Sequence, residues 1–172
     1  MAKEMVAVCL PPEAHGRLRP AIEEAMAPFD MNGGHEPYQG EWDQWWLGRE
    51  GEEFDVLPGH EDDPRLVRGP LDADDTSRPE THGRCYGGPR GLLDFDGMHA
   101  RAAQLAATLD PDELCGTPYR KWQPECVIPM DNLLTLDGAW FYTWRDEDRD
   151  FANAYLDDLA PDVVIVRLRI HC

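Results

Sequence analysis

Serine, lysine and phosphate-binding motifs are scarce in this chain of 172 residues, and each scarcity excludes a class of site. Ser77 is the only serine and no Gly-x-Ser-x-Gly motif occurs, which argues against a serine hydrolase. No glycine-rich turn leads into Gly-Lys-Ser or Gly-Lys-Thr, so the sequence has no P-loop. Lys3 and Lys121 are the only lysines, and abundant Ala, Gly, Pro and Asp accompany them. This composition indicates a high-GC, actinobacterial-type gene.

Long apolar runs and regularly spaced cysteines are also missing. The five cysteines are odd in number and irregular in spacing, which does not fit a disulfide framework. The longest apolar runs are far too short to span a bilayer, and no charged-then-apolar signal precedes Met5. We therefore expect a cytoplasmic protein with reduced thiols and no membrane attachment.

Acidic residues, in contrast, are in large excess. The chain has 34 Asp and Glu against 16 Lys and Arg, a formal net charge of −18. A surface of this sign repels phosphate backbones, so direct nucleic-acid binding is not expected. The charge fits a protein kept soluble in a crowded cytosol, and it also fits a protein that imitates DNA to occupy a DNA-binding partner.

The first 29 residues predict a strand and a helix. The run from Met5 to Leu10 is continuously apolar and is closed by two prolines, as in a buried strand. Apolar side chains then recur at helical spacing, which predicts a helix near residues 13–27. We expect a disturbance at Pro20 and an end at Pro28.

Later elements follow the same signals. Asp96 is a candidate N-cap for a helix that reaches about Leu109. A short strand is expected at residues 126–128. A hairpin then turns at Asp137-Gly138. A helix follows that is capped by Asp146 or Asp148 and has Phe151, Tyr155 and Leu159 on its apolar face. A final strand covers Val163 to Ile170.

Without residues 30–124, the element order is strand, helix, strand, hairpin, helix and strand. This order predicts an α+β fold, a ferredoxin-like split β-α-β sandwich. We expect one domain over residues 1–172, with its core in 1–29 and 125–172. The loop-rich insertion 30–124 then lies between the first helix and the central hairpin. Prolines and glycines punctuate the insertion, with short strands expected only around Trp45 and Phe54.

Three tryptophans within five residues mark the start of the insertion. Such a cluster fits a plug at the edge of a core. It also fits a recognition surface with neighbouring charges. We expect it to pin the insertion onto the sheet and to form one wall of a ligand site, whose other side is the Gly83–Arg90 loop. The predicted ligand-binding residues are Trp42, Asp43, Trp45, Trp46, Arg49, Arg84 and Arg90.

Few side chains are candidates for metal binding or covalent chemistry. His82, Cys85, His171 and Cys172 are the only close His and Cys pairs, and a structural zinc site usually needs two such pairs. Cys85 stands beside Arg84 and His82, a setting that lowers a thiol pKa. The candidate catalytic groups are therefore His82, Cys85 and His171. The alternative is that Cys85 is an ordinary loop cysteine and that His171-Cys172 is a terminal tail. We expect no cofactor.

The chain resembles a family of uncharacterised proteins from actinobacteria and their phages. The resemblance rests on a Trp-Asp-x-Trp segment at residues 42–45, a Gly-Arg-Cys-x-Gly-Gly-Pro segment at 83–89, an Asp-Gly-x-Trp hairpin at 137–140 and a C-terminal valine-rich strand. Members carry Gly-Gly-Arg-Trp after the first segment, where this chain has Leu-Gly-Arg-Glu. The family has no assigned activity, so the resemblance implies relatives and no mechanism.

Three functional hypotheses follow. The first is a binding or interaction protein that uses the Trp-rich insertion to hold a protein or small-molecule partner. The second is an enzyme with its pocket between the segment 42–49 and the Gly83–Arg90 loop. The third is a DNA mimic that inhibits a nucleic-acid-binding partner. The sequence leaves the oligomeric state open.

Overall fold

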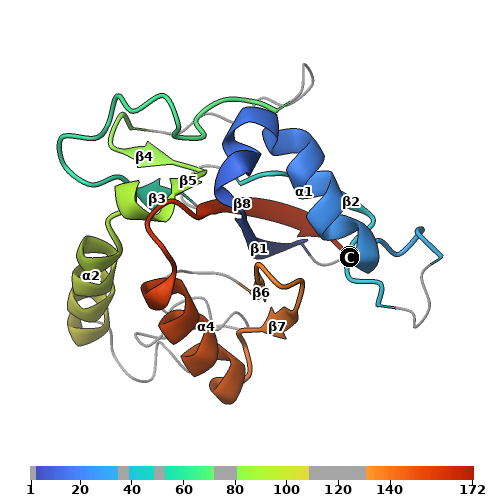
Figure 1. The fold of residues 1–172 in the computed structure, drawn as a ribbon. Coiled ribbons are helices and arrows are strands. Elements are labelled where there is room, and N and C mark those ends of the chain that lie inside the picture. Colours follow the sequence, from blue (N-terminus) through green and yellow to red (C-terminus); the bar gives the residue numbers. More distant parts are fainter. Residues whose placement is uncertain (1–2, 35–38, 49–52, 72–80, 109–130) are drawn as a thin grey trace.

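The computed structural model describes residues 3–34, 39–48, 53–71, 81–108 and 131–172 (Figure 1). Its centre is a six-stranded sheet of order β2-β8-β1-β6-β7, in which β5 also pairs with β8. The strands of this sheet are β1 (Lys3–Leu10), β2 (Gln44–Leu47), β5 (Gly87–Pro89), β6 (Asn132–Leu134), β7 (Trp140–Tyr142) and β8 (Val164–His171). A small ribbon pairs β3 (Phe54–Asp55) with β4 (Arg84–Cys85).

Three α-helices and three 3-10 turns complete the described residues. The helices are α1 (Leu18–Met26), α2 (Phe95–Thr108) and α4 (Asp146–Asp158). The 3-10 turns are η1 (Pro12–Arg17), η2 (Ala27–Phe29) and η3 (Arg90–Leu92). None of these helices is both long and apolar enough to cross a membrane. The α+β class expected from the sequence is confirmed.

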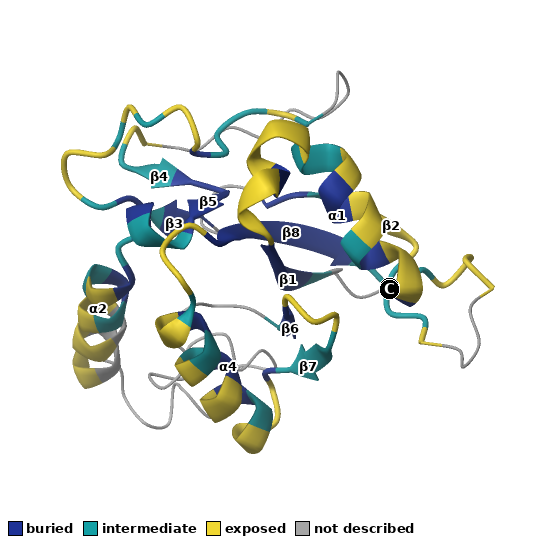
Figure 2. Ribbon diagram, viewed as in Figure 1, coloured by how far each residue is buried: buried dark blue, intermediate teal, exposed yellow. Residues whose placement is uncertain are grey.

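The strands β1 and β8 form the centre of the core because their apolar runs serve both faces of the sheet. They pair antiparallel from Lys3–His171 to Leu10–Val164. Val6, Val8 and Leu10 face α1, whereas Ala7 and Cys9 face the cluster that contains α2 and α4. Figure 2 shows both strands buried, with helices above and below them. Successive side chains of a strand alternate between faces, so a continuous apolar run is expected where both faces are covered.

The ferredoxin-like order is not confirmed. In that fold a strand of the hairpin separates the first strand from the strand after the first helix, and both helices cover one face. Here β6 pairs directly with β1 in parallel, and β7 takes the edge. Moreover, α1 packs on one face of the sheet, and α4 packs on the other (Figure 1). The apolar runs of β1 and β8 require this double cover. The expected strand at residues 126–128 lies outside the described residues.

The first helical region is interrupted before Pro20. The chain forms η1, leaves helical geometry at Arg17 with φ −146° and ψ 46°, and then enters α1. Pro20 falls in the first turn of α1, where its missing N–H has no intrahelical partner to lose. Pro28 lies in η2, which continues the helix for one short turn. The expected disturbance is therefore present, but three residues earlier.

The capping residues differ from the expected ones. Asp94 caps α2, because its carboxylate accepts the Gly97 N–H at 2.9 Å, whereas Asp96 lies exposed in the first turn. Arg145 occupies the N-cap position of α4 without a side-chain cap, and Asp146 and Asp148 lie in the first turn. Carboxylates there still favour the helix, since its N-terminus carries a partial positive charge.

The hairpin at Asp137-Gly138 is confirmed, with a longer turn than two residues. The strands β6 and β7 flank residues 135–139, and Gly138 has φ +80°. No non-glycine residue in the described part of the chain has positive φ, so Asp137 does not adopt the type I′ geometry. The Thr135 hydroxyl instead donates to the Asp137 carboxylate and accepts the Ala139 N–H at 3.1 Å. These bonds fix the loop.

The insertion extends the sheet along one edge of β8. The expected strands around Trp45 and Phe54 are present as β2 and β3. β2 pairs with residues 168–171 of β8, and β5 pairs with residues 164–166. Between them, the Arg167 carbonyl accepts the Gly48 N–H at 3.2 Å. The two sequence segments expected to lie together thus follow each other along a single strand.

Candidate binding site

The three tryptophans of residues 42–46 serve mainly as walls of the core. Trp42 and Trp45 are partly buried and pack against the cluster under α1. The Trp42 indole N–H donates to the Met26 carbonyl at 3.0 Å, and the Arg19 guanidinium lies 5.4 Å from the centre of the Trp45 ring. Trp46 pairs with Arg169 in the sheet and is partly buried. These contacts agree with the expected pinning of the insertion.

Asp43 and His171 form a close pair at the end of the sheet. The Asp43 Oδ1 atom lies 2.6 Å from His171 Nδ1, and the Asp43 N–H donates to the His171 carbonyl at 3.0 Å. Because His171 pairs with Lys3 in the sheet, this contact lies where β1 begins. The contact ties the start of β2 to the end of β8.

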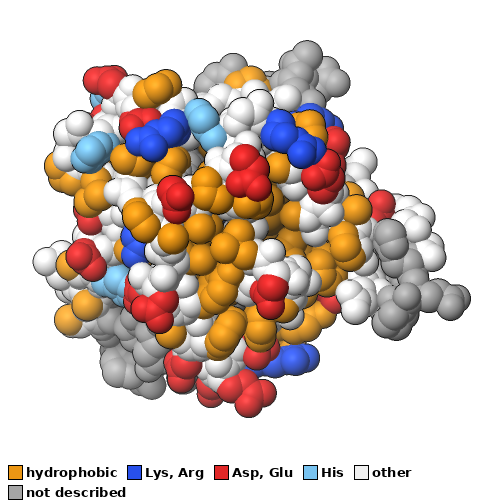
Figure 3. Space-filling model, in the orientation of Figure 1, with side chains coloured by type: hydrophobic (Ala, Val, Ile, Leu, Met, Phe, Trp, Pro, Cys, Tyr) orange, Lys and Arg blue, Asp and Glu red, His pale blue; other side chains and the backbone are white. Residues whose placement is uncertain are grey.

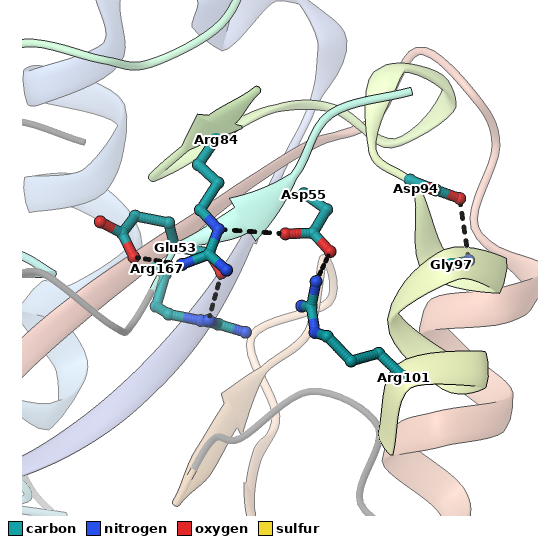
Figure 4. Close-up of polar contacts among 7 residues, drawn as sticks. All are labelled: Glu53, Asp55, Arg84, Asp94, Gly97, Arg101 and Arg167. Carbon is teal, nitrogen blue, oxygen red and sulfur yellow. Dashed lines mark hydrogen bonds and ion pairs between the residues drawn. The ribbon is translucent and has the colours of Figure 1, made fainter. Parts of the chain in front are cut away.

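Arg84 belongs to a charged network between the β3–β4 ribbon, α2 and β8 (Figure 4). Its Nε atom lies 3.4 Å from Asp55 Oδ1, and its Nη1 atom lies 3.8 Å from Glu53 Oε2. Arg101 of α2 pairs with the same Asp55 carboxylate. The Arg167 Nη1 atom donates to the Glu53 carbonyl at 3.3 Å. The network therefore joins four separate segments of the chain, and Arg84 is committed to it.

Arg90 faces α4 and not the tryptophan segment. Its Nε atom donates to the Leu156 carbonyl at 2.8 Å, and its guanidinium lies 3.8 Å from the centre of the Phe95 ring. Burial lowers the pKa of the Arg90 guanidinium. Asp43, Arg84 and Arg90 thus have three different sets of neighbours, and Arg49 lies outside the described residues.

The candidate catalytic and metal-binding groups are also dispersed. Cys85 is fully buried, and burial raises its pKa to about 11, the opposite of the expected lowering. His82 is exposed, with its Nε2 atom 3.0 Å from Asp62 Oδ1. Cys172 is partly buried, and burial raises its pKa too. In the part of the chain that the structure describes, no three His, Cys, Asp or Glu side chains are placed to hold a metal ion.

A cavity of about 360 Å³ opens at the carboxyl ends of β1 and β6. Ligand sites in sheets with parallel strands commonly lie outside these ends, where the connecting loops diverge. Here the chain leaves β1 into η1 and leaves β6 into the hairpin loop, so the cavity forms between them. Its volume is at the lower end of the range of about 300–1,000 Å³ for small-molecule sites.

Aliphatic side chains form the walls of this cavity. They come from the end of β1, the first helical region and the β6–β7 loop: Leu10, Ala14, Ala21, Ala25, Leu134 and Leu136. The three alanines keep the helical wall thin, which makes room between α1 and the loop. Leu136 is 43% exposed although it is a large apolar residue. Together these residues offer an apolar body a place to bury its surface.

Three charged side chains stand at the cavity: Glu13, Arg17 and Glu24. Arg17 and Glu24 form an ion pair, with both side chains more than half exposed. Thr135 also lines the cavity, but its hydroxyl donates a hydrogen bond to the Asp137 carboxylate within the hairpin loop. The fixed charges therefore comprise two carboxylates and one guanidinium, which favours a cation over an anion.

Figure 3 views the molecule as in Figure 1 and shows this face. Hydrophobic side chains gather between α1 and α4, around the β6–β7 hairpin, and acidic side chains stand among and around them. The sequence carried one signal for this site: two apolar runs, each ending in a turn. This signal does not locate the site, because nothing in the sequence places β1 and β6 side by side.

Comparisons with protein-family models, with curated proteins and with solved structures find no match to this chain.

Proposed function

We propose that this is a binding protein whose site is the cavity at the carboxyl ends of β1 and β6. Its ligand combines an apolar body with a positive charge. The observation that carries the proposal is the lining itself, in which aliphatic walls meet two carboxylates and one arginine. Burial of apolar surface supplies the affinity, at about 25 cal/mol per Å². The carboxylates select the sign of charge.

The charge preference has a local and a global source. Glu13 and Glu24 stand at the cavity, and Arg17 neutralises only one of them. The chain as a whole carries a formal charge of −18, which attracts cations toward any opening on its surface. An experiment must separate these two sources of charge preference. Variants that neutralise a carboxylate at the cavity are therefore compared with a variant that neutralises another carboxylate of α1.

The Trp-rich insertion has a supporting role in this proposal. Its strands β2 and β5 extend the sheet along β8, on the side away from β6. By pairing with that edge, they make β8 an internal strand of the sheet. The resemblance to the actinobacterial and phage family, and a cytoplasmic location, stay proposals that rest on the sequence.

The two other hypotheses have less support. An enzyme requires a His or Cys beside a pocketed acid or arginine. The Asp43–His171 pair meets the distance, but it lies at the opposite end of β1 from the cavity. A DNA mimic requires rows of carboxylates, whereas the acidic side chains in Figure 3 stand singly or in small groups among other side chains.

The proposal is tested with a matched pair of probes, 4-phenylbutylammonium and 4-phenylbutanoate, by ligand-observed NMR. Both carry a phenyl ring on a four-carbon chain, and they have opposite charge. We expect the ammonium probe to bind and the carboxylate probe to bind more weakly. Equal or tighter binding of the carboxylate probe contradicts the charge preference, and no binding of either probe contradicts the proposed function.

Variants locate the binding. Ala25→Leu adds bulk inside the cavity and is expected to abolish ammonium binding. The control is Ala100→Leu, which places the same side chain at an exposed position of α2. Glu13→Gln and Glu24→Gln are each expected to weaken ammonium binding about 2- to 5-fold. Glu23→Gln, next to the cavity residue on α1 and paired with Arg19, is expected to change it little. Equal effects of Glu23→Gln and Glu24→Gln indicate attraction by the global charge alone.

A further inference from the structure

A row of aromatic side chains continues the apolar surface beyond the cavity. The Leu136 N–H donates to the Tyr155 hydroxyl oxygen at 2.9 Å, so the cavity wall touches α4. The Tyr155 ring centre lies 5.7 Å from that of Phe151, which lies 4.4 Å from that of Phe141. Phe151 is 43% exposed, as is Leu136. We call Phe141, Phe151 and Tyr155, together with the adjoining Leu136, the aromatic row.

Carboxylates border the aromatic row along α4. Residues three and four positions apart are neighbours on a helix surface. Phe151 therefore has Glu147 and Asp148 beside it toward the N-terminus, and Tyr155 has Asp158 beside it toward the C-terminus. Asp146 to Asp158 contains six acids and one arginine, Arg149. Asp157 in the last turn lies 3.4 Å from His99 and 3.9 Å from Arg90, whereas Asp158, which opposes the helix dipole, is exposed.

We infer that the occupant of the proposed site is a basic, apolar segment of another protein, which fills the cavity with one side chain and lies across the aromatic row. This inference rests on the proposed function and names its partner class. Two observations carry it. The aromatic row begins at Leu136 in the cavity wall and reaches Phe151, so apolar side chains extend beyond the cavity. Carboxylates stand both at the cavity and along α4. Lysines or arginines spaced along a bound segment can therefore pair with carboxylates at both places.

Charge complementarity selects this occupant over a second copy of the chain. Two copies would bring acidic borders of the same sign together, each on a chain of net charge −18. Like-charge juxtaposition costs affinity, whereas a basic segment gains from the same borders. Exposed aromatic side chains held by stacking are typical anchors of protein interfaces.

The test compares two probes on the full chain. One is 4-phenylbutylammonium, which reports on the cavity alone. The other is a synthetic peptide that alternates lysine with leucine and phenylalanine, and its counterpart has glutamate in place of lysine. Affinities are measured for the wild type, Ala25→Leu, Phe151→Ser and Met31→Ser. Met31 is a matched control, because it is 40% exposed and lies outside the cavity and the aromatic row.

We expect Phe151→Ser to weaken the lysine peptide about tenfold and to leave the ammonium probe unchanged. Ala25→Leu should weaken both, and Met31→Ser neither. Peptide binding that is unchanged in Phe151→Ser overturns the inference, while loss of the ammonium probe in Ala25→Leu still supports the proposed function. Equal affinity of the glutamate peptide also overturns the inference. Self-association of the wild type that Phe151→Ser abolishes, measured by sedimentation, assigns the surface to a second copy instead.

Far-UV circular dichroism confirms that each variant is folded. If Phe151→Ser is unfolded, Leu136→Ser replaces it in the peptide test, since Leu136 is equally exposed and lies outside regular secondary structure. Because Leu136 also lines the cavity, this variant is expected to weaken both probes, with the larger loss for the peptide. An unchanged peptide affinity in Leu136→Ser overturns the inference as well.

Discussion

The backbone N–H of Leu136 donates to the hydroxyl oxygen of Tyr155 at 2.9 Å. This bond joins the loop after β6 to the middle of α4. The loop forms one wall of the cavity, and α4 lies on the face of the sheet opposite α1. The position of the wall therefore depends on α4. The bond connects the proposed ligand site to the aromatic row, and it gives a direct way to test that connection.

Tyr155→Phe removes this hydrogen bond and keeps the ring. Because Leu136 is exposed, water can take the place of the hydroxyl, and we expect a loss of unfolding free energy of about 0.5–1 kcal/mol. The freed loop should weaken binding of 4-phenylbutylammonium several-fold. Urea denaturation and ligand-observed NMR measure the two effects. Tyr142→Phe is the control, since the Tyr142 hydroxyl bonds Glu41 instead. Unchanged probe affinity in Tyr155→Phe would show that α4 does not position the loop.

Arg167 is expected to be among the most sensitive positions for stability. Its side chain is fully buried on β8, its guanidinium lies 4.1 Å from the centre of the Phe54 ring, and its Nη1 atom donates to Glu53. Arg167→Ala leaves a void and strands the polar groups around it, so we expect a loss of about 3 kcal/mol in urea denaturation. Arg65→Ala removes an exposed arginine paired with Asp63 and should change the free energy of unfolding little. Similar losses for both variants would contradict the role of the buried network.

Cys9 and Cys85 are expected to resist alkylation in the folded protein. Both are buried, and burial raises the pKa of each thiol, for Cys85 to about 11. At pH 8 the reactive thiolate is therefore rare and shielded. Of the cysteines that the structure describes, Cys172 is only partly buried and should react with iodoacetamide before Cys9 and Cys85. Peptide mass mapping after timed exposure distinguishes the three sites, with urea-unfolded protein as the reference. Rapid labelling of Cys85 would contradict this prediction and would support the hypothesis of a cysteine nucleophile.

Tyr142 is expected to make stability depend on alkaline pH. Burial, followed by its hydrogen bond to the Glu41 carboxylate, raises the pKa of Tyr142 to about 12. An unfolded tyrosine has a pKa of about 10. The neutral phenol is thus favoured in the folded state, and its contribution is complete below pH 10 and is lost as the pH rises toward 12. Unfolding midpoints between pH 8 and 11 should fall more in the wild type than in Tyr142→Phe. Parallel curves would show that the Tyr142 pKa is unshifted.

The local elements could be predicted from the sequence because their signals are local. The apolar runs of β1 and β8, the helical spacing after Pro12 and the Asp137-Gly138 turn each appeared at the expected place. The choice of Asp94 over Asp96 as cap could not be made, since both residues precede apolar helical positions. Cap geometry depends on how the preceding chain enters the helix, which here is set by the Asp94 N–H donating to the Asp55 carbonyl at 2.8 Å.

The sheet order and the cavity could not be predicted, because both depend on long-range pairing. The sequence gives no register between Val6 and Asn132, although these residues are partners in the sheet. An apolar strand fits either a split or a direct β-α-β arrangement. The predicted ligand residues lie close together in the sequence, but Arg84 and Arg90 contact different neighbours in the folded chain.

The central claim is that the cavity between η1, α1 and the β6–β7 loop binds a cation with an apolar body. The most direct measurement is a titration of 15N-labelled protein with 4-phenylbutylammonium, followed by 1H–15N correlation spectra. We predict saturable shifts for the amides of Ala14, Ala25, Thr135 and Leu136, which are absent in Ala25→Leu. Shifts at Gln44–Leu47 and Arg84–Arg90, or small unsaturable shifts spread over the acidic surface, would contradict the claim.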